Sequence, residues 1–199
     1  MIYHSTRDEK LTAAPTRAVL EGIAPDGGLY VCDPGKPDFD WQGALQKDTM
    51  SMAADILGAL LPDFQDMNGL VRASYAGKFA SDDLTPLVPV GERYVLELYH
   101  GPTSAFKDVA LSVLPRLVSA AAKQEGAGDV VILTATSGDT GKAAMAGFAD
   151  VPGTRIIVFY PKSGVSPIQE KQMVTQKGDN TFVVGIHGNF DQAQTGVKK

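Results

Sequence analysis

Lys107 lies at the expected junction between a strand and a helix. Lys107 follows "RYVLELY" (93–99), whose β-branched and aromatic residues predict a buried strand, and precedes "DVALSVLPRLVSAAAKQ" (108–124), whose apolar residues recur at helical spacing. The first turn of a helix carries partial positive charge, which favours Asp108 and disfavours an ammonium group. A primary amine in this place can form a Schiff base with an aldehyde, with a solvated surface lysine as the simple alternative.

A second stretch whose residues could bind a ligand is "TATSGDTGKA" (134–143), which follows the expected strand "DVVILTA" (129–135). Its small residues let a ligand approach the backbone, and Thr136, Ser137 and Thr140 offer hydroxyl groups. The amides that open the next helix point toward an anion, so the stretch predicts an anion-binding loop. The same residues also make an ordinary helix cap. Neither the spaced glycines of a dinucleotide site nor the spacing of a P-loop is present.

The composition predicts a globular protein. The 199 residues are 44% hydrophobic and 21% charged, which is enough to bury a sizeable core in one or two domains. The 18 basic and 23 acidic residues give a net charge of −5, and no block of lysine and arginine could follow a phosphate backbone. We therefore expect no nucleic-acid partner.

The sequence also favours one cellular compartment. No apolar run reaches the ~18 residues that span a bilayer, and the start "MIYHSTRDEK" has no apolar signal core. The single cysteine, Cys32, cannot form a disulfide within the chain. We therefore expect a cytoplasmic protein without a membrane partner.

Two parts of the chain differ in their pattern of turn-forming and apolar residues. Residues 1–92 are rich in turn signals such as "APDGG" (24–28) and "DPGKPD" (33–38), and hold one expected amphipathic helix, "TMSMAADILGALL" (49–61). From residue 93 onward, β-type runs each precede a loop and a helical stretch, at residues 94–99, 129–135, 154–160 and 181–186. Four βα units in series predict an α/β fold with a mostly parallel sheet. The expected division is a loop-rich lobe over 1–92 and an α/β domain portion over 93–199.

The loops that follow parallel strands gather at one edge of the sheet, where such folds bind ligands. We therefore expect Lys107 and the loop 134–143 to be neighbours in space. Two further loops, "PKSGVSPIQEK" (161–171) and "HGNFDQ" (187–192), should reach the same edge. This combination fits a site in which the amine engages an aldehyde and the loop holds an anionic group.

Four separate stretches resemble one family, threonine synthase. "YHGPTSAFKD" (99–108) is similar to that family's pyridoxal-phosphate lysine motif, and "TATSGDTGKAA" (134–144) is similar to its next loop. "STR" (5–7) with "GIAPDGGLYV" (22–31) resembles its amino-terminal signature, and residues 160–199 resemble the βαβα stretch that follows. The order and spacing of these stretches match over nearly all of the 199 residues.

The resemblance implies a reaction and a cofactor. Threonine synthases are fold-type II enzymes that use pyridoxal 5'-phosphate to convert O-phosphohomoserine and water into threonine and phosphate. Lys107 matches the lysine that attaches the cofactor and moves protons between substrate carbons. The resemblance also implies that the loop 136–141 holds the substrate carboxylate and borders the cofactor ring. No metal ion is expected to take part.

The resemblance suggests the remaining site residues as well. Phe106 and Asp139 are expected beside the cofactor, with a packed core phenylalanine as an equal alternative for Phe106. Lys162 and Ser163 are candidates for binding the substrate's phosphate, with solvated surface residues as the alternative. The expected substrate-binding set is Thr136, Ser137, Gly138, Thr140, Gly141, Lys162 and Ser163.

The length departs from the resemblance. Family members are more than twice as long, and this sequence stops inside an expected helix, "FDQAQTGVKK" (190–199). The glycine-rich loop for the cofactor's phosphate, and the residue that faces its pyridine nitrogen, are expected in the carboxyl-terminal remainder of the enzyme. We therefore expect an amino-terminal piece that is inactive alone. Two alternatives stay open: another fold-type II lyase, against which "GIAPDGGLYV" argues, and a threonine-synthase-like domain that binds ligands without turnover.

Overall fold

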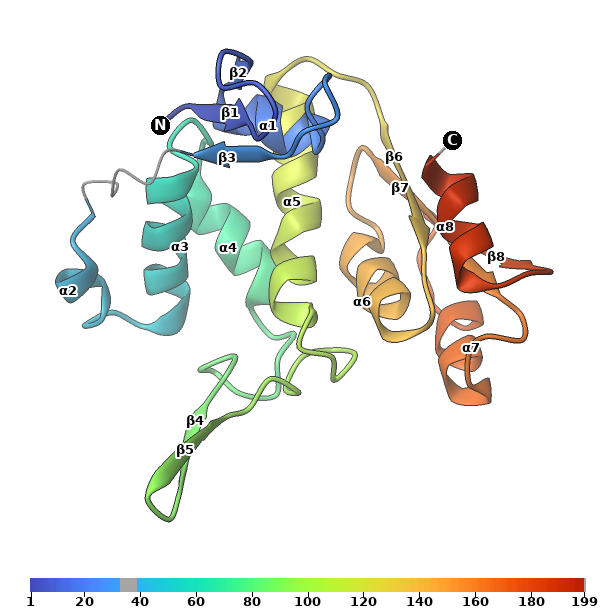
Figure 1. Ribbon diagram of the computed structural model, residues 1–199. Coiled ribbons are helices and arrows are strands. Elements are labelled where there is room, and N and C mark those ends of the chain that lie inside the picture. The colour runs from blue at the N-terminus through green and yellow to red at the C-terminus, as the bar shows by residue number, and fades with distance from the viewer. Residues whose placement is uncertain (33–38, 199) are drawn as a thin grey trace.

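Residues 1–32 and 39–198 are described by a computed structural model, drawn as a ribbon in Figure 1. The turn predicted at "DPGKPD" (33–38) lies outside the described residues. A small antiparallel sheet comes first in the chain, with the strand order β2-β1-β3. Its strands are β1 (Tyr3–Ser5), β2 (Thr12–Ala13) and β3 (Tyr30–Cys32).

The helices of the amino-terminal part are α1 (Pro15–Glu21), α2 (Trp41–Ala44), α3 (Thr49–Leu60) and α4 (Met67–Tyr75). The helix predicted over 49–61 is confirmed by α3, which begins where the Asp48 side chain accepts a hydrogen bond from the Ser51 amide (3.1 Å). Asp66 caps α4 in the same way through the Gly69 amide (3.0 Å). Aspartate oxygens stabilise a helix start because they satisfy amides that have no partner within the helix.

The central helix is α5 (Asp108–Gln124), which coincides with the stretch predicted from the sequence. Its buried residues Val113, Leu117 and Ala121 pack against α3 and α4 in one hydrophobic core, together with Val71 and Tyr75. The core of the amino-terminal part therefore holds α5 from one side. Within the described residues, no helix combines the length and the apolar character needed to cross a membrane.

Tyr75 ties α4 to the first turn of α5. It is 5% exposed, and its hydroxyl donates a hydrogen bond to the Val109 carbonyl (2.8 Å). Burial raises the pKa of Tyr75 from its ordinary value of 10.0 to about 12. Because the folded state holds this proton more tightly than the unfolded state, the linked stability is present below pH ~10 and is lost as the pH rises toward ~12.

Tyr75→Phe should lower the free energy of unfolding by about 1 kcal/mol at neutral pH, because the hydrogen bond to Val109 is lost. Urea denaturation measures the difference. Tyr94→Phe is the matched control, since Tyr94 is 70% exposed, and it should unfold like the wild type. Between pH ~10 and ~12 the wild type should lose more stability than Tyr75→Phe, and equal losses would contradict this assignment.

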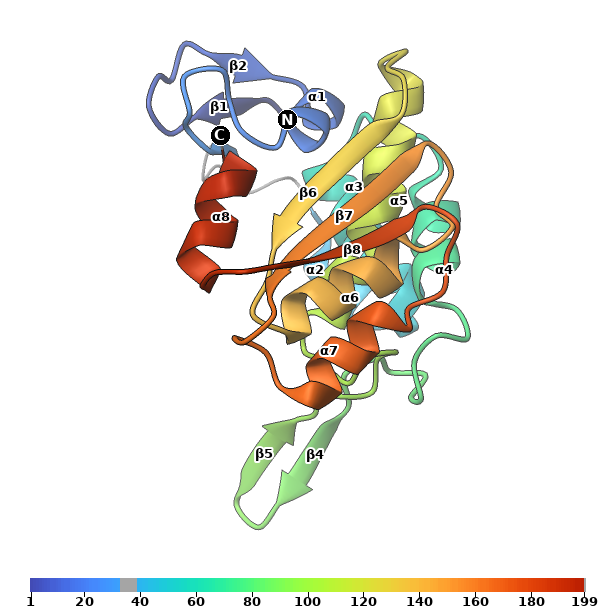
Figure 2. The same cartoon turned by 90° about the vertical axis from the view of Figure 1, so that its right-hand side faces the viewer.

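A three-stranded parallel sheet follows α5, in the order β6-β7-β8. Its strands are β6 (Val130–Ala135), β7 (Thr154–Pro161) and β8 (Thr181–Ile186), and its helices are α6 (Asp139–Phe148), α7 (Pro167–Val174) and α8 (Phe190–Lys198). α6 and α7 cover one face, where Met145, Ile156, Val158 and Met173 form a second core. α8 lies on the other face (Figure 1 and Figure 2). This arrangement confirms the predicted α/β class, and the boundary expected after residue 92 stays a prediction.

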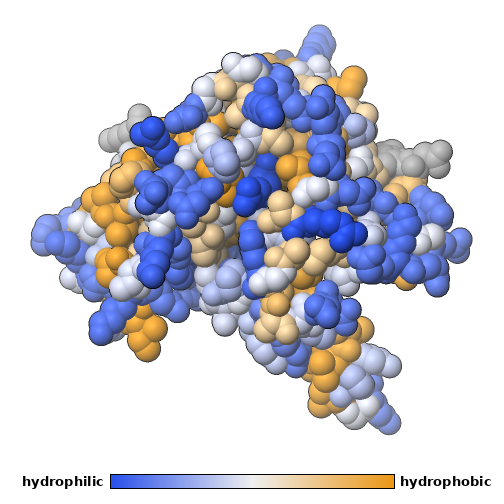
Figure 3. Space-filling model, turned by 180° about the vertical axis from the view of Figure 1, so that it is seen from behind, coloured by the Kyte–Doolittle hydropathy of each residue, from blue (hydrophilic) through white to orange (hydrophobic). Residues whose placement is uncertain are grey.

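The first of the four predicted parallel strands is different. β5 (Arg93–Leu96) pairs with β4 (Leu87–Val90) in an antiparallel hairpin that projects from the molecule (Figure 1). The prediction of a buried strand over 93–99 is therefore wrong: Tyr94 is 70% exposed and Leu96 is 52% exposed. Figure 3 shows hydrophobic side chains on this projection. The described part of the chain has three parallel strands in place of the four expected.

A tight turn explains the difference. Gly91 has a φ of +60°, a backbone conformation that favours glycine, and it forms the short connection between β4 and β5 with Glu92. β-type residues predict that a strand forms, but they do not predict which strand it pairs with. The neighbouring run "LVPV" (87–90) is only a turn away from β5, whereas β6 is more than thirty residues away. Local pairing therefore takes β5 out of the parallel sheet.

Candidate functional site

The first turns of α5, α6 and α7 lie close together. α5 and α6 pack side by side and begin at the same end of the molecule (Figure 1). The charge of Asp108, in the first turn of α5, acts on Lys142 in the first turn of α6. In α7, the Gln169 side chain donates a hydrogen bond to the Asp139 carboxylate of α6 (3.0 Å). The structure therefore brings Lys107 and the loop 136–141 to one end of the fold.

A buried carboxylate shapes the loop that carries Lys107. Asp108 is 2% exposed, and its two oxygens accept hydrogen bonds from the Thr103 amide (2.7 Å) and the Thr103 hydroxyl (2.6 Å). Gly101 lies so close that a Cβ built on it would come within 2.5 Å of the Asp108 side chain. Ser104 has a φ of +58° at the apex of this turn. The sequence predicted only that Asp108 complements the helix dipole. The structure shows that its carboxylate also holds the preceding loop through Thr103.

Lys107 is the amino-terminal cap residue of α5 and is half-buried. Its Nζ lies 4.1 Å from the centroid of the Phe106 ring, which is a cation–π distance. Phe106 is 60% exposed, so it is not packed in a core formed by the described residues. Within the described part of the chain, Lys107 forms no ion pair, so its amine is available to a ligand.

The loop between β6 and α6 is held from inside by Thr136. This residue is buried, and its hydroxyl oxygen accepts hydrogen bonds from the amides of Gly138 (3.0 Å) and Gly141 (2.9 Å). Ser137 and Thr140 are exposed. Among the described residues, no acceptor binds the backbone amides of Ser137, Asp139 or Thr140. The loop therefore presents free amides and hydroxyls on its outer side, which suits an anionic group.

Close packing explains the two glycines of this loop. A Cβ on Gly138 would come within 2.4 Å of the Gln169 side chain, and a Cβ on Gly141 would come within 2.4 Å of the Thr136 side chain. Gly138 also has a φ of +148°, in the region that disfavours L side chains. Gln169 closes a capping box with Ser166, which "SPIQ" (166–169) could have indicated. No pattern in the sequence indicates the hydrogen bond from the Gln169 side chain to Asp139.

Lys142 is a second lysine at this end of the fold that the sequence did not single out. Desolvation lowers the pKa of its ammonium group, and the negative charge of Asp108 acts in the opposite direction. Its Nζ donates a hydrogen bond to the Gln176 side chain, just after α7. Lys142 is therefore engaged inside the fold, in contrast to Lys107.

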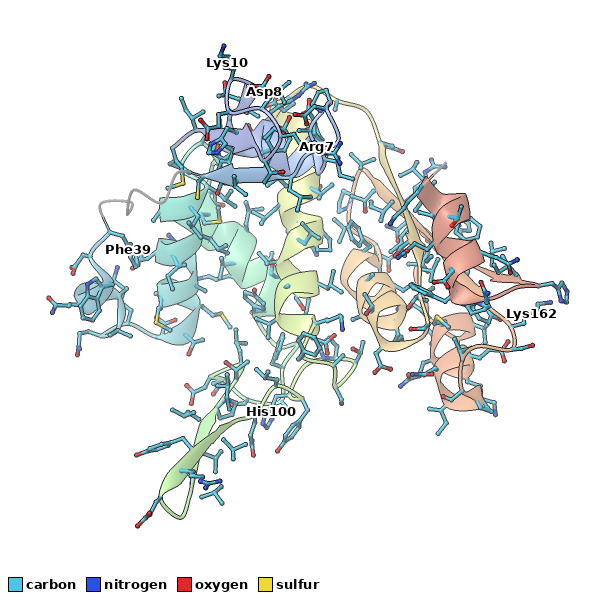
Figure 4. The ribbon with its side chains drawn as sticks, in the orientation of Figure 1. Arg7, Asp8, Lys10, Phe39, His100 and Lys162 are labelled. Carbon is cyan, nitrogen blue, oxygen red and sulfur yellow. The ribbon has the colours of Figure 1, made fainter. Side chains whose placement is uncertain are left out.

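Lys162 and Ser163 are not brought to Lys107. The Lys162 amide donates to the Ile186 carbonyl (3.1 Å), and its side-chain carbons lie against Gly185 of β8. Figure 4 places Lys162 at the side of the molecule away from α5, and Ser163 is exposed in the same loop. His100 lies nearer, at the base of the hairpin in Figure 4, where it pairs with Glu97 (2.7 Å) and thereby lowers the pKa of that carboxyl.

The donor set fits the reactive end of the cofactor that the resemblance implies. Lys107 offers a primary amine for an aldehyde, and Phe106 offers an exposed aromatic face beside it. The outer side of the loop 136–141 offers amides for a carboxylate. The expected cradle for the cofactor's own phosphate belongs to the carboxyl-terminal remainder and stays a prediction.

Comparison with known proteins agrees with the resemblance. The family model described as "Threonine synthase N terminus" matches residues 2–88. Threonine synthase of Saccharomyces cerevisiae is 35% identical over 220 residues, which cover 99% of this chain and 42% of the yeast protein. Threonine synthase of Pseudomonas aeruginosa is 38% identical over 206 residues, which cover 100% of this chain and 43% of that protein. Threonine synthase-like 1 of Homo sapiens is 31% identical over 203 residues, which cover 92% of this chain and 26% of the human protein.

Solved structures give the same likeness. The structure of PLP bound threonine synthase from Brucella melitensis matches with a TM-score of 0.90 at 37% identity, covering 100% of this chain and 44% of that one. The structure of threonine synthase from yeast matches with a TM-score of 0.84 at 32% identity, covering 100% of this chain and 43% of that one. This chain therefore spans less than half the length of the curated relatives it matches.

Proposed function

The chain corresponds to the amino-terminal portion of threonine synthase, and from this premise we propose that it is part of an enzyme that converts O-phosphohomoserine and water into threonine and phosphate. The proposed cofactor is pyridoxal 5'-phosphate, and the proposed location is the cytoplasm. The observation that supports the proposal best is the available amine of Lys107 beside the starts of α5, α6 and α7. It occurs in a chain that is 37% identical over its whole length to a PLP bound threonine synthase.

Each residue has a proposed role. When bound, pyridoxal phosphate supplies an electron sink beside the substrate carbons. Lys107 attaches it, and its Nζ then carries protons from one substrate carbon to another. Phe106 and Asp139 border the cofactor ring.

The loop 136–141 is the proposed site for the substrate carboxylate. The free amides of Ser137, Asp139 and Thr140 can donate to it, and the Ser137 hydroxyl can add a hydrogen bond. Thr136, Gly138 and Gly141 keep these amides in place. We do not extend the proposal to Lys162 and Ser163, because their loop lies beside β8.

The proposed partner of this chain is the carboxyl-terminal remainder of the same enzyme. The hairpin β4–β5 exposes Leu87, Val90, Tyr94 and Leu96, and the α8 face of the sheet exposes Val131, Leu133, Phe182 and Val184. A two-stranded hairpin is marginally stable by itself, and parallel sheets are normally covered on both faces. We infer that the remainder packs on these surfaces and supplies the cradle for the cofactor's phosphate.

The test of the proposed function is turnover by the full-length protein. Incubation with O-phosphohomoserine and pyridoxal phosphate should release phosphate and threonine in equal amounts. Cofactor binding without phosphate release would instead favour the alternative of a threonine-synthase-like domain that binds ligands without turnover. Turnover of other amino acids only would favour another fold-type II lyase.

The 199-residue chain alone should retain the cofactor weakly and show little or no synthase activity. A doubly anionic phosphate contributes much of the affinity for such a cofactor, and its expected cradle lies in the remainder. Equilibrium dialysis of the chain against pyridoxal phosphate measures the affinity, with the full-length protein as the control. Submicromolar binding by the chain alone would contradict this prediction.

Ser137→Ala in the full-length protein should lower kcat/KM by roughly tenfold, which is about 1.4 kcal/mol of transition-state binding. Its melting temperature should not change, because Thr136 and not Ser137 accepts the amides that hold the loop. Thr136→Val is the contrasting variant and should lose about 1–3 kcal/mol of stability. A lower melting temperature with unchanged kcat/KM in Ser137→Ala would mean that Ser137 only caps the helix.

A further inference from the structure

A cleft of about 580 Å³ lies between α4, α5 and the turn that precedes β7. Leu70 and Ala73 line it from α4, Arg116 and Lys123 line it from α5, and Pro152 lines it from the turn that precedes β7. None of these residues belongs to the site around Lys107. Figure 3 shows the face on which α4 lies, with hydrophilic side chains around a hollow near its centre.

Arg116 is the unusual group in this cleft. Its Nε is buried and has no hydrogen-bond partner among the described residues. Within the same residues, no carboxylate forms an ion pair with its guanidinium group. Buried donors are nearly always paired, so this Nε is unusual, although Arg116 as a whole is half-buried and lines the open cleft. The guanidinium group therefore has the capacity to bind an anion that the described residues do not supply.

The charge around Arg116 favours an anion. Lys123 lies two turns further along the same face of α5, about 10 Å away along the helix axis, and it forms no ion pair within the described part of the chain. The pKa of the Lys78 ammonium is lowered, first by desolvation and then by the positive charge of Arg116. Asp66 is the acidic residue in the lining, and one of its oxygens caps α4 through the Gly69 amide (3.0 Å).

Two other polar residues of the cleft, Ser119 and Gln124, already have partners. Ser119 donates from its hydroxyl to the Pro152 carbonyl (2.7 Å). Gln124 donates from its side-chain amide to the Asp63 carbonyl (3.0 Å) and accepts from the Gln65 amide (3.3 Å). These contacts fix the walls on both sides of α5. The walls of the cleft are therefore held by contacts within the fold, and Arg116 and Lys123 are left as its available donors.

We propose that this cleft binds a small oxyanion, a phosphate ester or a carboxylate, through the guanidinium group of Arg116 with support from Lys123. A guanidinium fork matches the paired oxygens of both anions. The apolar lining from Leu70, Ala73 and Pro152 leaves room for a short carbon chain. The proposal does not depend on the proposed function, since the cleft shares no residue with the Lys107 site.

Nuclear magnetic resonance of arginine side-chain Nε–H groups in the full-length protein tests the proposal. Inorganic phosphate and succinate are the two probes, titrated separately at constant ionic strength. The Arg116 signal, assigned by its absence in Arg116→Gln, should shift and saturate. Saturation with phosphate alone identifies a phosphate ester, and saturation with succinate alone identifies a carboxylate.

Two variants make the outcome decisive. Lys123→Gln should weaken binding by about threefold, the size of one exposed charge contact. Lys177→Gln removes the same charge from an exposed position outside the cleft, and it should bind like the wild type. The absence of a saturable shift across the millimolar range would overturn the proposal. Equal weakening in both lysine variants would also overturn it, because the effect would then reflect net charge.

Discussion

Lys107→Ala in the full-length protein is expected to lower kcat by roughly 10⁴-fold, the upper range for loss of a positioned proton-transfer group. It should also abolish covalent attachment of pyridoxal phosphate. Lys107 Nζ has no ion-pair partner within the described residues and lies over an exposed aromatic ring at the start of α5. Among the residues that the structure describes, the nearby Lys142 is already bound to Gln176, so it is not free to take over both tasks.

The measurement has two parts. Steady-state phosphate release gives kcat, and borohydride reduction followed by peptide mass spectrometry identifies the lysine that carries the cofactor. Lys142→Met is the contrasting variant, since it removes the other lysine at this end of the fold. Attachment that persists in Lys107→Ala and disappears in Lys142→Met would show that the assignment is wrong.

Helices whose signals are local could be predicted from the sequence. α3 and α5 were predicted within a residue because apolar periodicity and a capping or first-turn aspartate mark each of them. The strands of the parallel sheet were found in the same way. The hairpin β4–β5 was missed because the pairing of a strand depends on which strands are available nearby. The turn at Gly91 brings β4 next to β5, so β5 pairs with β4 and not with the parallel sheet.

The proximity of Lys107 and the loop 136–141 could be predicted from the sequence, but the contacts within this region could not, and the assignment of the site residues stays a prediction. The predicted helix starts placed Lys107 and the loop 136–141 beside the first turns of α5 and α6, and the structure brings both to one end of the fold, although the strand predicted before Lys107 is not part of the parallel sheet. Thr136 looked like a ligand-binding hydroxyl, yet its oxygen is used inside the loop. The pair formed by Asp139 and Gln169 joins residues 30 positions apart, so no local pattern could indicate it.

Asp108 should control the position of Lys107, and its substitution is the second large effect that we predict. Asp108→Ala removes the acceptor of both the amide and the hydroxyl of Thr103 and leaves them inside a closed turn. The expected cost is about 2–4 kcal/mol in the free energy of unfolding, since two hydrogen bonds to a charged group are lost and partly buried donors are left unpaired. For a chain of this size the melting temperature should fall by roughly 5–15 °C.

Calorimetry of Asp108→Ala measures this loss, and Asp82→Ala is the matched control because Asp82 is exposed. Thr103→Val separates the two hydrogen bonds, since it removes the hydroxyl and keeps the amide, and it should cost about half as much. If Asp108 only stabilised the start of α5 through its charge, Thr103→Val would have no effect and Asp108→Asn would cost as much as Asp108→Ala. A graded series, with Asp108→Asn between the wild type and Asp108→Ala, is expected instead, because one asparagine oxygen can still accept from the Thr103 amide. In the full-length enzyme, kcat should fall in the same order while Lys107 itself is unchanged, because the turn that aims its amine is progressively released.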